Sequence, residues 1–254
     1  MAKADTNPRQ RQFHSIFRRH VLAPVRAAES RVERERTEIV AERDAFEQFA
    51  KRVADVPPVS PRAQVRPIGT RTVVNPSNEA NVRRQTAEAL RRAYADTVVA
   101  VPHYDDVYGE PVVENAAAEF GPELARLLVP SDGAAFVRRH KEALVGAAER
   151  GVTEREEFRG ILDTEIDSLR ASRRELTAVL DELETTTVPS GYRTQFEDDL
   201  TRTLRARQST LASQPTLSHL DAHNVCTYLY DDEPWTYPVL TAVARVLDSV
   251  TVRD

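Results

Sequence analysis

The fold is decided by residues 161–184, whose sequence is ILDTEIDSLRASRRELTAVLDELE. Large apolar residues recur there at alternating spacings of four and three, the period of one face of an α-helix. Together with one arginine they form the set Leu162, Ile166, Leu169, Arg173, Leu176, Leu180 and Leu183. We therefore predict an amphipathic helix of about 48 Å from Thr153 to Glu184, at about 1.5 Å per residue. A helix break is expected near Gly151, because Thr153 and Glu156 have the spacing of a capping box.

A second long helix is predicted from about Phe13 to Val56. Apolar residues recur every seven positions, at Val25, Val32, Ile39, Phe46 and Val53. The companion position of this heptad is apolar except at Glu35 and Glu42. The pattern indicates a coiled-coil-like helix with an imperfect seam. Pro24 is expected to mark a kink or the helix start, because proline lacks the backbone donor of a helix interior.

The rest of the chain predicts shorter helices joined by turns. Five prolines between residues 57 and 78 indicate a linker. Helices are expected at about 78–101, 112–129 with an interruption near Gly121, 134–184, 194–213, 218–230 and 238–250, with an antiparallel hairpin over about 153–213. The predicted fold is all-α: an elongated antiparallel helical bundle with coiled-coil-like long helices and a Pro-rich linker. The predicted segments are 1–56 (basic N-terminal helix), 57–78 (linker) and 79–254 (bundle).

Composition narrows the class of protein. The 254 residues are 41% apolar and 30% charged, with a net charge of −5. Only Lys3, Lys51 and Lys141 are lysines, so arginine supplies the other 32 of the 35 basic residues. This usage, with the acidic excess, suits a GC-rich genome and a salty cytoplasm. One cysteine, Cys226, excludes an internal disulfide, and no signal peptide or membrane-spanning run is apparent, so a cytoplasmic location is expected.

Two motifs carry a resemblance to a known family. Residues 100–111 read AVPHYDDVYGEP, and residues 228–240 read YLYDDEPWTYPVL. With the leading heptads they resemble an uncharacterised haloarchaeal family of helical, coiled-coil-containing proteins of unknown function, over about Val32 to Leu247. The resemblance implies a helical fold and a salty habitat, and it implies no activity, cofactor or catalytic residue.

Three residues offer metal-ligand chemistry. His219, His223 and Cys226 are spaced by four and three, so a helix would place them on one face. Imidazole and thiolate suit zinc, which would need a fourth ligand such as His140. The alternative is that they are ordinary polar residues of a half-buried helix, and no metal or other cofactor is assigned.

The loop after Pro102 is the second candidate. It contains His103, Tyr104, Asp105, Asp106, Tyr108 and Glu110. A histidine beside carboxylates could act as a general acid or base. Alternatively, the carboxylates favour the start of the next helix at Pro111, and the two tyrosines anchor the loop by packing. We take His103, Tyr104, Asp105 and Tyr108 as candidate partner-binding residues.

The N-terminus is the third candidate. Residues 6–28 contain five arginines and no acid, and apolar and aromatic residues follow helical spacing at Phe13, Ile16, Phe17, His20 and Val21. Such a helix, with Arg18 and Arg19, could bind an anionic membrane surface or an acidic partner. Alternatively, it is the opening segment of the first bundle helix, whose apolar face packs internally.

The function expected from the sequence is non-enzymatic. We found no phosphate-binding glycine loop, dinucleotide fingerprint or nucleophile elbow. The leading interpretation is an interaction or structural protein that buries apolar helix stripes against a partner or a second copy. The alternatives are a membrane-surface or regulatory binding protein using the N-terminal helix, and a metal-dependent or small-molecule-binding enzyme. Nucleic acid is not expected as a partner, because the basic stretch lacks a binding motif.

Overall fold

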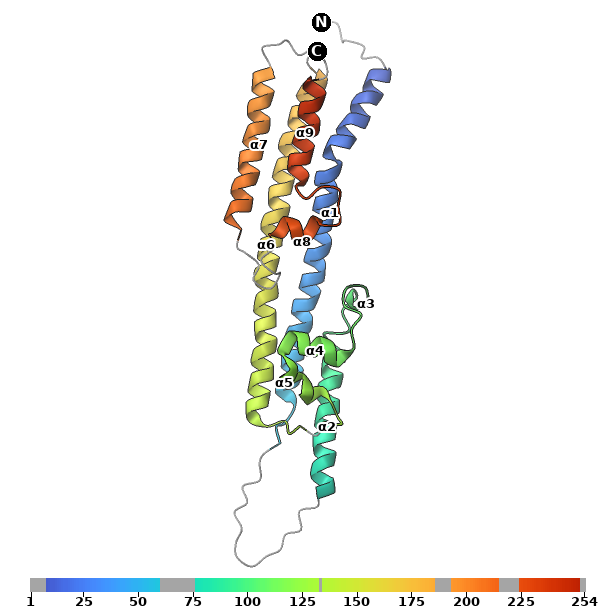
Figure 1. Ribbon diagram of the computed structural model, residues 1–254, viewed down its shortest axis with the longest axis vertical. Helices are drawn as coiled ribbons and strands as arrows, with labels where there is room; N and C mark the ends of the chain where they lie inside the picture. Colours follow the sequence, from blue (N-terminus) through green and yellow to red (C-terminus); the bar gives the residue numbers. More distant parts are fainter. Residues whose placement is uncertain (1–7, 60–75, 133, 186–192, 215–223, 252–254) are drawn as a thin grey trace, which may run out of the picture. The chain divides into compact units, whose positions relative to one another are not determined.

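The structure is a computed structural model that describes residues 8–59, 76–132, 134–185, 193–214 and 224–251. Throughout these ranges the secondary structure is helical and no strand occurs, which confirms the predicted all-α class (Figure 1). The helices are α1 (Pro8–Asp55), α2 (Pro76–Ala95), α3 (Tyr104–Val107), α4 (Val112–Phe120), α5 (Pro122–Ala125), the 3-10 helix η1 (Arg126–Leu128), α6 (Arg138–Thr185), α7 (Arg193–Ser213), α8 (Val225–Tyr230) and α9 (Pro238–Thr251). None of the described helices is both long and apolar enough to cross a lipid bilayer.

The chain forms two compact units. The central unit is Thr37–Arg159, and the terminal unit joins Met1–Arg36 to Gly160–Asp254. The long helices α1 and α6 therefore contribute residues to each unit. The predicted linker stays a prediction, because residues 60–75 lie outside the described part of the chain.

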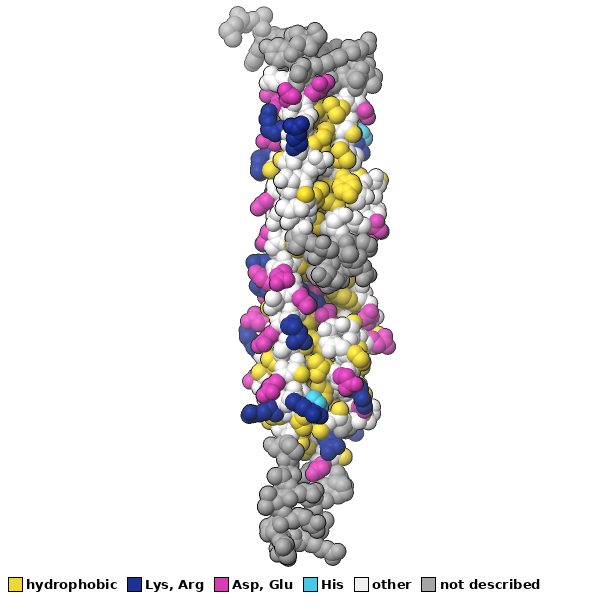
Figure 2. Space-filling view, turned by 60° about the vertical axis from the view of Figure 1, so that its left-hand side comes forward, with side chains coloured by type: hydrophobic (Ala, Val, Ile, Leu, Met, Phe, Trp, Pro, Cys, Tyr) yellow, Lys and Arg dark blue, Asp and Glu magenta, His cyan; other side chains and the backbone are white. Residues whose placement is uncertain are grey.

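In each unit, α1 and α6 pack antiparallel. In the terminal unit, Arg18 pairs with Asp181 and Arg36 with Asp163, so residue numbers rise along α1 as they fall along α6. In the central unit the same register appears in the Arg43–Glu156 pair, at 3.5 Å. Figure 2 shows both signs of charge interspersed along one face of the chain. Exposed pairs of this kind contribute little stability, so apolar burial holds the helices together.

The heptad seam of α1 is buried as predicted except at Ile39, which is half-buried. Val25, Val32, Phe46 and Val53 are at most 1% exposed. The acidic companions follow the same inward face, with Glu35 at 9% and Glu42 at 6% exposed. Helix α1 runs through Pro24, so this proline is not the helix start.

The predicted break near Gly151 is wrong. Helix α6 runs uninterrupted from Arg138 to Thr185, and Thr153 donates its hydroxyl to the Glu149 carbonyl at 3.1 Å instead of capping a helix. Gly151 instead allows α1 and α6 to pack closely at this point. A Cβ atom at Gly151 would lie 2.7 Å from the Phe46 ring, so only glycine lets α1 bring that ring against α6.

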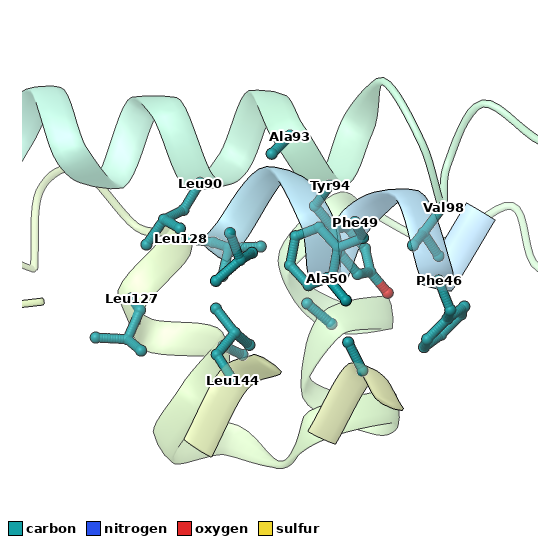
Figure 3. Close-up of a cluster of buried hydrophobic side chains, with 14 of the residues drawn as sticks. Phe46, Phe49, Ala50, Leu90, Ala93, Tyr94, Val98, Leu127, Leu128 and Leu144 are labelled. Carbon is teal, nitrogen blue, oxygen red and sulfur yellow. The ribbon is translucent and has the colours of Figure 1, made fainter. Parts of the chain in front are cut away.

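The core of the central unit is an aromatic cluster between α1, α2, α4 and α6 (Figure 3). Phe49 stacks on Phe120 at 5.5 Å and meets Tyr94 edge-on at 5.1 Å between ring centroids. The Tyr94 hydroxyl donates to Asn115 at 2.6 Å, which satisfies two polar groups inside the cluster. Helix α2 ends at Ala95, earlier than the predicted 101, and the predicted loop after Pro102 contains the short helix α3.

The core of the terminal unit lies along the predicted α6 stripe. Leu162, Leu169 and Leu176 are fully buried, whereas Arg173 is half-buried and pairs with Glu29 at 2.6 Å. Helix α7 runs antiparallel to α6 and buries Phe196 and Leu200 (Figure 1). Helices α8 and α9 complete the unit, with the Asn224 side chain capping α8.

Candidate functional site

The candidate loop closes on one carboxylate of α1. Glu42 Oε1 accepts hydrogen bonds from His103 Nε2 at 2.9 Å and from the Tyr108 hydroxyl at 3.0 Å. Its Oε2 accepts from Arg155 Nε at 2.8 Å. The Glu42 carboxylate, on the inward face of α1, therefore contacts three donors: two from the loop after Pro102 and one from α6. We call these four residues and Glu119 the Glu42 network.

Arg155 is the cation of this network. Its Nη2 donates to Glu119 Oε1 at 2.9 Å, and its guanidinium carbon lies 3.9 Å from the centroid of the Phe46 ring. Burial alone would lower the pKa of Arg155, but the Glu119 and Glu42 carboxylates outweigh burial and raise it. The arginine is therefore a permanent counter-charge between two carboxylates.

The tyrosines of the loop act as donors. Burial, followed by the Glu42 charge, raises the pKa of Tyr108, so its phenol stays protonated and donates. Tyr104 is buried, donates its hydroxyl to the Glu110 carbonyl at 3.0 Å and packs 5.5 Å from the Tyr108 ring. Gly109, at φ +58°, lets the chain turn away after α3.

The structure thus divides the predicted loop residues. His103, Tyr104 and Tyr108 point inward to hydrogen bonds, whereas Asp105, Asp106 and Glu110 are exposed. Sequence reasoning missed Glu42, Arg155 and Glu119 as partners of His103. The available signal was Glu42 itself, an acid in a buried heptad position that must find donors.

The terminal unit contains a second buried ionic centre. Glu165 of α6 and Arg207 of α7 share two hydrogen bonds, of 2.6 and 2.8 Å. Tyr230 donates to the same carboxylate at 2.9 Å, and Arg207 also donates to Ser168 at 3.0 Å. We call this the Glu165 centre. No pattern in the sequence singled it out, because its members come from three separate helices.

Cys226 belongs to the Glu165 centre. It is fully buried, its sulfur lies 3.5 Å from Arg207 Nη2, and burial raises its pKa to about 12. The predicted companions His219 and His223 lie outside the described residues, and His140 faces the Ala135 carbonyl at 2.8 Å. Within the described ranges, no group of three or more histidine, cysteine or acidic side chains is placed to hold a metal ion.

The N-terminal candidate residues are distributed around α1. Val21 is fully buried and Phe17 half-buried, whereas Ile16 is 58% exposed. Arg18 pairs with Asp181, and Arg19 is exposed. The side chain of Phe13 lies outside the described part of the chain. The predicted stripe is thus divided between the bundle interior and the surface.

Taken together, these observations define an all-helical protein whose long helices carry buried carboxylates held by arginine, imidazole and phenol donors. Residues 23–254 match the family described as a domain of unknown function, DUF7260, and the chain belongs to that family. The predicted relationship to a family of unknown function is thereby confirmed. No curated protein and no solved structure matches the chain.

Proposed function

We propose that this protein is a non-catalytic helical interaction protein that pairs with a second copy of itself through the outer face of α9. The observation that carries the proposal is that α9 is apolar on two sides. Its inner side, Val239, Ala242, Val243 and Val246, is at most 1% exposed. Its outer side, extended by Tyr237 just before the helix, is a second apolar row, which we call the outer seam: Tyr237, Leu240, Ala244 and Leu247.

The outer seam has the spacing of a helix-pairing surface. Its residues are separated by three, four and three positions, and Tyr237, Leu240 and Leu247 are 44%, 51% and 39% exposed. Only Arg245 and Asp248 are charged within Pro238–Thr251. A row of exposed apolar side chains on a helix often marks an interaction surface, so the outer seam supports a surface that is buried on association.

A second copy of α9 fits the shape of this seam. The small Ala244 lies between the larger Leu240 and Leu247. Two such seams packed antiparallel about a twofold axis at Ala244 bring the helices close at the alanines, while leucines fill the spaces on either side. Twofold contacts of this kind close on themselves and give a dimer.

The buried charges support the non-catalytic part of the proposal. In the Glu42 network and the Glu165 centre, each carboxylate accepts hydrogen bonds from an arginine and from tyrosine. Groups whose hydrogen bonds are satisfied in this way tie helices together, which supports a structural role for these two carboxylates.

Light scattering coupled to gel filtration tests the proposal. The 28.5 kDa chain should elute with twice its monomer mass as its concentration rises from about 1 µM to about 200 µM. Leu240→Glu should hold it at the monomer mass. The matched control is Val82→Glu, because Val82 is a similarly exposed valine (41%) on α2. Self-pairing would be overturned by a monomer mass at every concentration, or by an equal loss of the dimer in the Leu240→Glu and Val82→Glu variants.

A second function is favoured by the exposed face of α1. Ile16, Arg19, His20 and Arg26 are exposed there, and no acid occurs between residues 6 and 28. We propose that this face binds anionic lipid surfaces. Charge supplies most of the attraction, because Val21 is buried in the bundle and cannot insert into the lipid. Flotation with phosphatidylserine vesicles should be lost in the Arg19→Glu/Arg26→Glu variant. Equal flotation with neutral vesicles would contradict it.

The habitat expected from composition is also a proposal. Thirty-two arginines against three lysines and a net charge of −5 support a haloarchaeal source and a salt-rich cytoplasm. Circular dichroism from low to multimolar salt should show helix content and thermal stability rising with salt. A stability unchanged over that range would remove this proposal.

A further inference from the structure

A surface hollow of about 320 Å³ lies in the terminal unit between α1 and the end of α8. Ser30, Arg31 and Arg34 line it from α1, at helical spacings that place them on one side of that helix. The facing wall is the turn that follows α8, with Asp232 and Glu233, and the buried Leu229 forms an apolar part of the lining. The hollow therefore has a basic wall, an acidic wall and an apolar patch.

The two walls are held in place by bonds outside the hollow. Tyr228 donates to Glu35 of α1 at 2.6 Å, and Tyr230 donates to Glu165 at 2.9 Å. The Glu233 N–H donates to the Tyr230 carbonyl at 3.1 Å, which closes the turn. The position of the acidic wall is thus fixed by α8 and by the Glu165 centre.

The charges that face each other across the hollow are not joined. Arg31 Nε is buried and has no hydrogen-bond partner. Among the described residues, neither Arg31 nor Arg34 forms an ion pair with a carboxylate, and neither Asp232 nor Glu233 forms one with a basic side chain. Elsewhere on α1 the arginines at 18, 36 and 43 all pair with acids of α6. Opposite charges that line one hollow without pairing to each other are suited to a ligand that carries both charges.

We propose that this hollow binds a small dipolar molecule with a carboxylate at one end and an ammonium group at the other. The carboxylate accepts from the guanidinium groups of Arg31 and Arg34, a pairing for which arginine geometry is suited. The ammonium group donates to Asp232 and Glu233, and the intervening methylene groups lie over Leu229. The volume of about 320 Å³ is at the lower end of ligand pockets, which matches a molecule of amino-acid size.

Calorimetric titration of the full chain with ω-amino acids of increasing length, from glycine to 8-aminooctanoate, tests the site at the lowest salt that keeps the protein folded. Hexanoate and hexylamine, which carry one charge each, are the half-ligand controls. We expect a clear optimum in chain length, with the best ω-amino acid binding at least about tenfold more tightly than either half-ligand. No binding across the series, or half-ligands that bind equally well, would overturn the proposal.

Charge-removing variants assign the two ends. Arg31→Gln and Arg34→Gln should weaken the ω-amino acid and hexanoate, whereas Asp232→Asn and Glu233→Gln should weaken the ω-amino acid and hexylamine. The matched controls are Arg26→Gln on α1 and Asp231→Asn in the same turn, since neither residue lines the hollow. Equal weakening in these controls would mean that general charge, and not the hollow, attracts the ligand. The Leu240→Glu variant should bind the ligand normally, so the two proposals fail or succeed separately.

Discussion

Arg207 and Glu165 form a doubly hydrogen-bonded ion pair in which the arginine side chain is 6% exposed and the glutamate side chain is fully buried. Removing two charges from water is costly, and only good geometry offsets that cost. Here Tyr230, Ser168 and Gln214 supply further hydrogen bonds to the pair. Because these partners must all meet, the pair specifies one register of α7 on α6.

Replacing Arg207 by methionine should therefore destabilise the protein strongly. Glu165 would keep the Tyr230 hydroxyl but lose its counter-charge, and a buried charge left alone costs about 3–5 kcal/mol. Chemical denaturation followed by circular dichroism measures the loss in unfolding free energy. The midpoint of thermal unfolding should also fall.

Two controls separate the pair from general effects. The double variant Glu165→Met/Arg207→Met removes both charges and should regain most of the lost stability. Glu47→Ala breaks the exposed pair with Lys51, whose side chains are 53% and 69% exposed, and should change stability little. A single Arg207→Met variant as stable as the wild type would show that the pair does not hold α7.

The Glu42 network predicts a graded response. Tyr108→Phe removes one hydrogen bond and should cost about 1 kcal/mol. Glu42→Ala removes the acceptor of three donors and leaves Arg155 with one carboxylate, so it should cost about 3 kcal/mol or more. Hydrogen exchange should localise the effect, with faster exchange at the Tyr108 and Gly109 amides, which donate to the Tyr104 carbonyl. Equal costs for the two variants would contradict a network centred on Glu42.

Periodicity predicted the long helices because their stripes are local properties of the chain. Val25, Val32, Phe46 and Val53 are separated by seven residues or by fourteen, and one face of a regular helix is then apolar and becomes buried. The same reasoning predicted a helix at about 238–250, where α9 lies; Val239 and Val243 of its apolar residues are buried, whereas Leu240 and Leu247 are exposed. The interruption near Gly121 was also predictable, because the glycine is followed by Pro122. In the structure Gly121 takes φ +84° and separates α4 from α5.

The network could not be predicted because its partners are distant in sequence. Glu42 reaches His103 and Arg155 across 61 and 113 positions. Local patterns give the face on which an acid lies but not the donors that face it. The error at Gly151 has a similar origin: within its own helix the glycine resembles a break, and only the Phe46 ring from α1 explains it.

Gly151 and Gly160 should respond oppositely to alanine. A Cβ at Gly151 would lie 2.7 Å from Phe46, which is too close, so Gly151→Ala should cost about 1–3 kcal/mol through forced repacking. Gly160 has open space around its position, and alanine there should add up to about 1 kcal/mol because it favours the helix. Denaturation midpoints for both variants measure the difference. Stabilisation by Gly151→Ala would mean that the ring does not pack against this turn.

Stability should fall in alkaline solution through Cys226. Burial raises the pKa of this thiol from 9.0 to about 12, so the folded protein holds the proton more tightly than the unfolded chain. The contribution is complete below about pH 9 and is lost as pH rises towards about 12, because only the unfolded thiol ionises in that window. Buried Tyr94 and Tyr230, whose pKa values burial also raises, extend the loss to higher pH.

Cys226→Ala isolates the thiol from the tyrosines. Unfolding free energies measured at about pH 8, 9 and 10 should decline more steeply in the wild type than in this variant, because alanine has no proton to lose. A thiol reagent at about pH 8 should react with the native protein far more slowly than with the denatured chain, since the Cys226 sulfur is buried beside Arg207. Rapid reaction in the native state would contradict the burial of this residue, and identical slopes for the two proteins would contradict the raised pKa.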